Sequence, residues 1–190
     1  HLPPTLREPM PRTTAAAVAP PAAFAAGRYG EDALLQVLAS DHEIVADQRY
    51  FDAIRIARDT AAQGKLVTFG INPDEPATGY GYIEIGEPLA TGAHAVKRFV
   101  EKPALAEAER MLAAGGFCWN SGIFMFSAGQ VLGEMETYAP AVAEAARESV
   151  AKAVADLDFI RLDAAAFARS PDISIDYGIM GKAGHAAGGR

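Results

Sequence analysis

At residues 98–103 the chain reads RFVEKP, and the pattern of the sequence changes there from strand to helix. Residues 96–100 are rich in β-branched and aromatic side chains, which predicts a strand. From Ala104 the apolar residues recur at helical spacing until a pair of glycines ends the pattern. We therefore expect Glu101 and Lys102 to lie between the carboxyl end of a strand and the first turn of a helix.

This position suits an anionic ligand. In open α/β sheets, ligands bind at the carboxyl ends of the strands, and the start of a helix favours an anion. Lys102 can meet a phosphate as a point charge, and Glu101 can accept hydrogen bonds from hydroxyl groups. An exposed Glu-Lys pair without a ligand explains the same two residues when they are taken alone.

Composition narrows the classes of protein. The chain has 190 residues, half of them hydrophobic, which predicts a globular protein with one sizeable core. The net charge of −7 argues against a nucleic-acid partner and against an anionic membrane surface, so local cations must meet any anionic ligand. Cys118 is the single cysteine, which is compatible with a reducing cytoplasm, and a cytoplasmic location is expected. No apolar run approaches the roughly 20 residues that cross a bilayer.

A strand, a helix and a second strand are predicted at residues 33–38, 47–64 and 65–69. Such a βαβ unit has parallel strands and a right-handed crossover. Its helix has an expected buried face consisting of Phe51, Ile54, Ala57 and Ala61. Asp41 follows the first strand, as Glu101 follows its own strand. Taken alone, an aspartate there is more often a turn former or a helix cap than a metal ligand.

Two further stretches contain candidate ligand contacts. Residues 79–82 read GYGY, and two glycines around a tyrosine permit a close approach of the backbone to a ligand, although a turn or a bulge explains them equally well. Residues 118–126 predict a buried strand with Trp119 in the core. Asn120 in that strand needs hydrogen-bond partners, either from the backbone or from ligand hydroxyls.

The two ends of the chain give weaker patterns. The first thirty residues are rich in alanine and proline, which predicts no regular structure before Thr13 and a broken helix after it, or else a low-complexity linker. Residues 127–157 predict two helices, and the second begins at Pro140. Residues 183–190 are expected to form a flexible tail. The chain begins with His1 rather than methionine, and we expect it to be a piece of a longer protein.

Seven motifs, taken in order, resemble those of the bacterial mannose-1-phosphate guanylyltransferases, also called GDP-mannose pyrophosphorylases. They are EPMPR (8–12), SDH (40–42), KLVTFGI (65–71), TGYGYI (78–83), RFVEKP (98–103), WNSGIF (119–124) and SIDY (174–177). The resemblance extends over residues 7–182, and we treat residues 1–182 as one nucleotidyltransferase domain that is incomplete at both ends. It implies an α/β protein with the Rossmann-like nucleotide-diphosphosugar transferase fold, in which helices flank a mixed, mostly parallel sheet.

The same resemblance implies the reaction and its ligands. The family transfers GMP from GTP to mannose 1-phosphate, which gives GDP-mannose and pyrophosphate. GTP and mannose 1-phosphate are therefore the expected substrates, Mg²⁺ is the expected cofactor, and a homodimer is left open. Phosphoryl-type transfer depends on in-line positioning and on neutralisation of charge. A sugar phosphate is already ionised at neutral pH, so no general base is required.

The residue roles also follow from the resemblance. Asp41 and Asp176 would hold the magnesium ion, and Lys102 would pair with the phosphate of the sugar. The implied substrate contacts are Glu101 and Asn120 for the mannose hydroxyls, Gly81 through its backbone, and Glu8, Arg12 and Thr14 around the guanine and its ribose. Magnesium prefers one or two carboxylates together with substrate phosphates, and two aspartates suit that preference.

One family motif has no match in these 190 residues, namely the glycine-rich loop that holds the nucleotide phosphates. We therefore expect the isolated chain to bind its substrates weakly and not to turn over. Two alternatives stay open. The first is a catalytically silent paralogue that binds a nucleotide or a sugar phosphate, and the second is a pyrophosphorylase for another nucleotide or hexose 1-phosphate.

Overall fold

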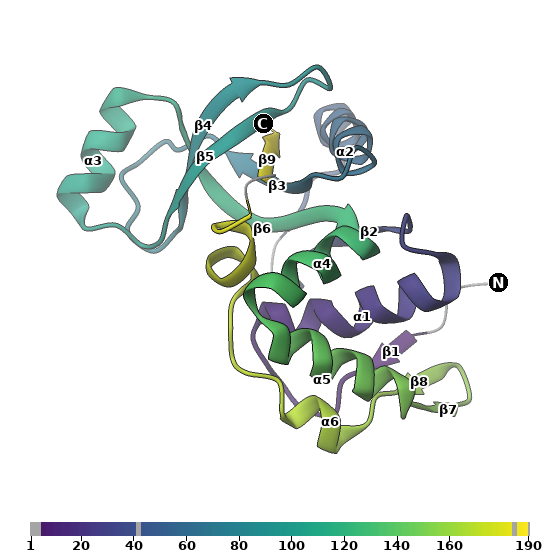
Figure 1. Cartoon of the computed structure of the whole chain (residues 1–190). Helices are drawn as coiled ribbons and strands as arrows, with labels where there is room; N and C mark the ends of the chain where they lie inside the picture. The colour runs from purple at the N-terminus through teal and green to yellow at the C-terminus, as the bar shows by residue number, and fades with distance from the viewer. Residues whose placement is uncertain (1–4, 41–42, 184–185, 190) are drawn as a thin grey trace. The chain divides into compact units, whose positions relative to one another are not determined.

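The computed structural model describes residues 5–40, 43–183 and 186–189. The chain forms two compact units, one consisting of residues 1–33 and 127–182 and the other of residues 34–126 and 183–190. Figure 1 labels the helices and strands of both units. Each unit has its own buried residues and its own sheet, and each is described below by itself.

The first unit is mainly helical. Its helices are α1 (Thr14–Tyr29), α4 (Ala128–Tyr138), α5 (Pro140–Ala151), α6 (Ala164–Ala168) and the single π-turn η1 (Asp176–Met180). Its small sheet consists of β1 (Thr5–Arg7), β8 (Phe159–Arg161) and β7 (Val154–Asp156), in that order. β1 is parallel to β8, and β7 is antiparallel to β8.

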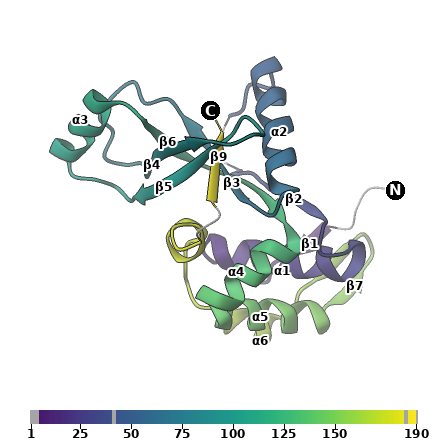
Figure 2. The ribbon, with the colours of Figure 1, turned by 45° about the horizontal axis from the view of Figure 1, so that its top comes forward.

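Helix α1 runs without interruption through Pro20 and Pro21, so the prediction of a broken helix was wrong. The two prolines remove two backbone donors, but α1 packs against α4 and α5, and Figure 2 shows the three helices side by side. Ala15, Ala19 and Ala22 on the buried side of α1 are fully buried. Small alanines allow a close helix contact, and this packing outweighs the unfavourable local propensity.

Two other expectations for the first unit also need correction. Residues 5–7 form β1 although no regular structure was predicted before Thr13, because these residues gain hydrogen bonds from β8 that the local sequence does not indicate. The helix that begins at Pro140 is confirmed, but residues 154–157 form the first strand and turn of a hairpin instead of helix. Leu157 lies in that turn with a φ of 55°.

The second unit is built on a six-stranded sheet with the order β2-β6-β3-β9-β5-β4, and β6 also pairs with β4. The strands are β2 (Leu34–Val37), β3 (Leu66–Ile71), β4 (Tyr82–Pro88), β5 (His94–Val100), β6 (Phe117–Ser127) and β9 (Ala186–Gly189). Its helices are α2 (Gln48–Ala61) and α3 (Leu105–Ala114). An α/β fold with a mixed sheet, as the sequence predicts, is confirmed.

The prediction that the sheet is mostly parallel was wrong in detail. Among the described pairings, β3–β9 is parallel, whereas β3–β6, β4–β5, β4–β6 and β5–β9 are antiparallel. The short turn between β4 and β5, in which the Leu89 amide donates to the Ala93 carbonyl, permits only an antiparallel neighbour. The elements of the predicted βαβ unit are present, and β6 lies between its two strands.

Strand β9 forms inside the segment that was expected to be a flexible tail. Residues 186–189 pair with β3 on one side and with β5 on the other, and Ala187 is fully buried. The sequence there is AAGG, which has no apolar periodicity. Its backbone nevertheless pairs with two neighbouring strands, and this pairing does not depend on the pattern of its side chains.

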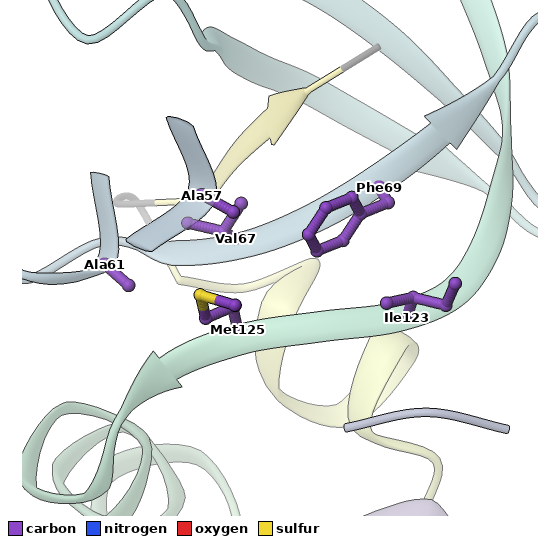
Figure 3. Packing of buried hydrophobic residues seen from close by; sticks show 6 residues of the cluster. All are labelled: Ala57, Ala61, Val67, Phe69, Ile123 and Met125. Carbon is purple, nitrogen blue, oxygen red and sulfur yellow. The ribbon is translucent and has the colours of Figure 1, made fainter. Parts of the chain in front are cut away.

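Helix α2 covers the sheet of the second unit with the C-terminal half of its apolar face. Figure 3 shows Ala57 and Ala61 of this helix facing Val67 and Phe69 of β3 and Ile123 and Met125 of β6. Ile54 is partly buried beside this cluster. Phe51, which was expected on the same face, is 55% exposed; it lies in the first turn of α2, where its ring makes a T-shaped contact with the ring of Tyr50.

Helix α3 packs on the same unit at the predicted position after RFVEKP. Its Ala108 and Met111 form a buried cluster with Tyr82 of β4, and Trp119 packs against that cluster. Across both units, no helix in the described part of the chain is long and apolar enough to span a membrane.

Candidate functional site

One row of residues crosses three neighbouring strands of the second unit. Val100 is paired with Tyr82, and Tyr82 is paired with Trp119. One position further along this row come Glu101 after Val100, Gly81 before Tyr82 and Asn120 after Trp119. These are three of the residues implied to bind mannose. The backbone N–H of Asn120 donates a hydrogen bond of 2.8 Å to the Gly81 carbonyl.

The contact between these three residues is close. A Cβ atom added at Gly81 would lie 3.0 Å from Oε2 of Glu101 and 3.7 Å from Cβ of Asn120. A side chain at Gly81 would thus press on the Glu101 carboxylate. The neighbours of Gly81 are thus the two side chains predicted to bind the sugar, and the approach of its backbone to a ligand stays a prediction.

Lys102 follows Glu101 at the end of β5. Its Nζ lies 3.9 Å from Oε1 of Glu101, and the side chains are 67% and 55% exposed. Lys102 has a φ of 40°, in the left-handed region that residues other than glycine rarely adopt. The two charged groups are therefore exposed together at a strand end, where a phosphate and a hydroxyl could reach them.

Asn120 is fixed by a bulge in β6. The paired residues are Gly70 with Asn120 and Thr68 with Phe124, so Phe69 alone opposes residues 121–123. The Thr68 hydroxyl lies 2.9 Å from Oδ1 of Asn120, and the Gly122 amide donates to the same oxygen at 3.4 Å. The Asn120 amide oxygen thus has the backbone and side-chain partners that a half-buried amide needs.

Asn120 also lines a cleft of about 630 Å³ that lies within the second unit. Phe69 and Ile123 contribute apolar surface to it, whereas Tyr80 and Trp119 contribute two aromatic rings whose centroids are 5.1 Å apart. The Trp119 Nε1 atom is buried and has no hydrogen-bond partner among the described residues. A cleft of this size and composition is typical of small-molecule sites.

Arg49 brings a positive charge to this cleft. Its guanidinium donates to Oδ2 of Asp47 over 3.0 Å and 2.9 Å, while Oδ1 of Asp47 accepts from the Tyr50 amide and caps α2. The hydrogen bond from the Tyr50 amide, followed by that from Arg49, lowers the pKa of Asp47. Arg49 is therefore held at the start of α2 by an ionised partner.

The residues expected around the guanine lie in the first unit, and two of them, Arg12 and Thr14, contact the segment that leads to Asp176. Arg12 donates to the Ala168 carbonyl over 2.8 Å, and the Thr14 hydroxyl accepts from the Ile175 amide over 2.9 Å. Partial burial raises the pKa of Glu8. Arg12 and Thr14 thus have structural partners, and their role at the base stays a prediction.

The predicted magnesium pair is described only in part. Asp41 lies outside the described residues, whereas Asp176 is the first residue of η1 and is half-buried. No group of three or more His, Cys, Asp or Glu residues gathers anywhere in the described ranges. A single carboxylate together with phosphate oxygens nevertheless suits the ligand preference of Mg²⁺, so the donor chemistry at Asp176 fits the metal.

Comparison with known proteins agrees with the sequence motifs. The sequence model described as "Nucleotidyl transferase" matches residues 4–166. The chain belongs to the nucleotidyl transferase family.

Relatives of this nucleotidyl transferase include the mannose-1-phosphate guanylyltransferase of Sinorhizobium fredii, which is 52% identical over 180 residues, or 95% of this chain and 35% of that protein. The xanthan biosynthesis protein XanB of Xanthomonas campestris is 51% identical over 93% of this chain and 37% of its own length. The chain thus spans about a third of the length of these curated relatives. The predicted resemblance to bacterial mannose-1-phosphate guanylyltransferases is confirmed.

Solved structures with the same fold are also known. The crystal structure of a protein named mannose-6-phosphate isomerase, from Helicobacter pylori, has a TM-score of 0.83 and 35% identity, and the match covers 96% of this chain and 70% of that one. A protein named mannose-1-phosphate geranyltransferase, from Thermus thermophilus, gives a TM-score of 0.81 and 33% identity, over 95% of this chain and 50% of that one. The α/β fold of the nucleotidyl transferase is therefore shared with both.

Sequence reasoning missed three residues of the candidate site. Tyr80 was treated only as the residue between two glycines, Trp119 was assigned to the core alone, and Thr68 was read as part of an apolar strand. Trp119 directly precedes Asn120, but successive residues of a strand point to opposite faces, so their order does not indicate that both line one cleft. Nothing in the local sequence indicates the contact between Thr68 and Asn120, which depends on the pairing of β3 with β6.

Proposed function

We propose that this nucleotidyl transferase transfers GMP from GTP to mannose 1-phosphate and releases pyrophosphate. The observation that supports it most strongly is the meeting of Gly81, Glu101 and Asn120 in one row of the sheet, with Lys102 beside them. Relatives that carry the name of this activity, at 44–52% identity, support the same reaction. We also propose that the protein works in the cytoplasm.

In this proposal the sugar phosphate is held by groups of complementary chemistry. Lys102 donates to the phosphate as a point charge, Glu101 accepts hydrogen bonds from sugar hydroxyls, and Asn120 donates to another hydroxyl. Gly81 leaves room for the ligand, because it has no side chain on that side. The exposed position of Glu101 and Lys102 at the end of β5 allows both groups to turn toward the ligand.

The transfer itself needs no protein nucleophile. An oxygen of mannose 1-phosphate forms a bond to the α-phosphorus of GTP, the bond from that phosphorus to the oxygen bridging it to the β-phosphorus breaks, and pyrophosphate leaves with the electron pair. Asp176, with Asp41, would hold Mg²⁺, which supplies positive charge to the phosphate oxygens when it is bound. Lys102 neutralises charge on the attacking phosphate and keeps it in line.

The test is pyrophosphate release by the gene product at full length, with GTP, mannose 1-phosphate and Mg²⁺, and with GDP-mannose identified by chromatography. We expect GTP to be preferred over ATP, UTP and dTTP, and mannose 1-phosphate over glucose 1-phosphate. A different preferred pair would point to a pyrophosphorylase of other specificity. Substrate binding without release of pyrophosphate from any pair would favour a silent paralogue.

A further inference from the structure

Thr68 and Asn120 lie on neighbouring strands, yet their contact depends on an irregularity. Gly70 is paired with Asn120, so in a regular antiparallel ladder Thr68 would be paired with Gly122. The bulge instead places residues 121–123 of β6 opposite the single residue Phe69 of β3. Across this irregularity the Thr68 hydroxyl lies 2.9 Å from Oδ1 of Asn120.

The donors around Asn120 determine which way its amide is turned. The Gly122 backbone amide can only donate, and it lies 3.4 Å from Oδ1 of Asn120. The atom that faces it must therefore be the oxygen. The Thr68 hydroxyl, which is fully buried, donates to the same oxygen. The amino group of Asn120 is consequently the end of the amide that is turned away from Thr68.

The bulge has its own support. The Ser121 hydroxyl donates to the Phe69 carbonyl over 2.7 Å and accepts from the Ile123 amide over 3.2 Å. The Thr68 hydroxyl also lies 3.5 Å from the Ile123 carbonyl, but the two bonds of Ser121 are shorter and tie the extra residues of β6 to β3 without that hydroxyl. Removing that hydroxyl should therefore leave the backbone of the bulge in place and release only the orientation of the Asn120 amide.

We propose that Thr68 is a positioning residue of the sugar-phosphate site. Its hydroxyl holds the oxygen of Asn120 inside the sheet, so that Asn120 presents a hydrogen-bond donor to the sugar. This role rests on the proposed function, because it assumes that Asn120 contacts the sugar. It assigns to Thr68 a share in the recognition of the hexose without any contact between Thr68 and the ligand.

The first test uses Thr68→Val, which keeps the shape of the side chain and removes its hydroxyl. We expect the KM for mannose 1-phosphate to rise about five-fold in the full-length gene product, with the KM for GTP unchanged, since one neutral hydrogen bond is lost at the sugar. Thr68→Ser should restore the wild-type value. In an Asn120→Ala background, Thr68→Val should have no further effect on this KM.

Thr60→Val is a matched control. Thr60 is also a buried threonine, and its hydroxyl donates to the Ile56 carbonyl and contacts Thr91 in the same unit. This variant should lower the midpoint of thermal unfolding without changing the KM for mannose 1-phosphate. If Thr68→Val behaves like Thr60→Val, or if its effect persists in the Asn120→Ala background, the positioning role is refuted. Should Thr68→Val not fold, Thr68→Ala takes its place in the same comparison.

A second measurement separates this inference from the proposed function. Selective labelling with ¹⁵N-asparagine makes the side-chain amide of Asn120 visible by NMR whether or not the protein makes GDP-mannose. We expect its two proton signals to shift and broaden in Thr68→Val and to stay at the wild-type positions in Thr68→Ser and Thr60→Val. Unchanged Asn120 signals in Thr68→Val would overturn the inference even in a fully active enzyme.

Discussion

Replacing Gly81 by alanine tests the arrangement of the site most directly. The φ of Gly81 is not positive, so alanine can adopt its backbone conformation without strain. The new Cβ would lie 3.0 Å from Oε2 of Glu101, whereas ordinary contacts begin at 3.4 Å. The carboxylate must therefore move by about 0.4 Å, and it can do so because the Glu101 side chain is 55% exposed.

The size of the effect follows from this displacement. A misplacement of about 1 Å at a reacting centre costs roughly 100-fold in rate. If the logarithm of the rate loss is proportional to the displacement, about 0.4 Å costs roughly six-fold. We expect Gly81→Ala to lower kcat/KM for mannose 1-phosphate by about that factor and to leave the KM for GTP unchanged. Stability should not fall, since alanine removes conformational freedom from the unfolded chain by about 0.4–1 kcal/mol.

The assay is steady-state pyrophosphate release, together with urea unfolding of the same variants. Gly79→Ala is the control, because a Cβ at Gly79 would meet no atom of the described residues within 4 Å. Equal kinetics for Gly81→Ala and Gly79→Ala would refute the contact between Gly81 and the Glu101 carboxylate as a feature of the working site. A large loss of stability in Gly81→Ala would show that the carboxylate cannot yield, which would contradict its exposed position.

Three further predictions concern charged groups. Lys102→Ala should lower kcat/KM for mannose 1-phosphate by about 2–4 kcal/mol in free energy with GTP affinity nearly unchanged, and isothermal calorimetry showing equal weakening of both substrates would contradict this. Chelation of Mg²⁺ should stop pyrophosphate release, and Asp176→Asn should raise the Mg²⁺ concentration that gives half of the maximal rate. An unchanged half-maximal Mg²⁺ concentration would exclude Asp176 from the metal site. The hydrogen bond from the Thr13 backbone amide lowers the pKa of Asp172 in the folded protein. As the pH falls, Asp172 is therefore protonated in the unfolded chain first, and the free energy of unfolding should fall below about pH 4. Acid titration of Asp172→Asn should lack this contribution.

The parts of the fold that could be predicted are those in which the local pattern and the tertiary structure agree. Strand β5, helix α3 and strand β6 appear where the sequence predicts them, because side-chain periodicity and helix-ending glycines act locally. Helix α1 and strand β9 were missed because their residues are stabilised by distant partners. The prolines of α1 oppose a helix, and AAGG has no strand pattern, yet packing on α4 and α5 and pairing with β3 and β5 stabilise both.

The candidate site shows the same division. Glu101, Gly81 and Asn120 could be named from motifs, since each belongs to a short stretch of recognisable sequence. Their meeting in one row could not be derived from spacing, because it depends on which strands are neighbours. Thr68 left no local signal at all, since a threonine in a strand is what β-propensity alone would place there.

Strand β6 explains why these residues meet. Its N-terminal part pairs with β4 through residues 117–119, and its later part pairs with β3 from Trp119 to Met125. Asn120 lies where the pairing passes from one neighbour to the other, so Gly81 approaches it from the side of β4 and Thr68 from the side of β3. A slip of β6 by one residue would turn Asn120 to the opposite face of the sheet and separate it from both. The hydrogen bonds of Ser121 across the bulge, and the φ of 70° that Gly122 adopts within it, oppose such a slip. The bulge therefore fixes the register of the strand and the position of the amide together.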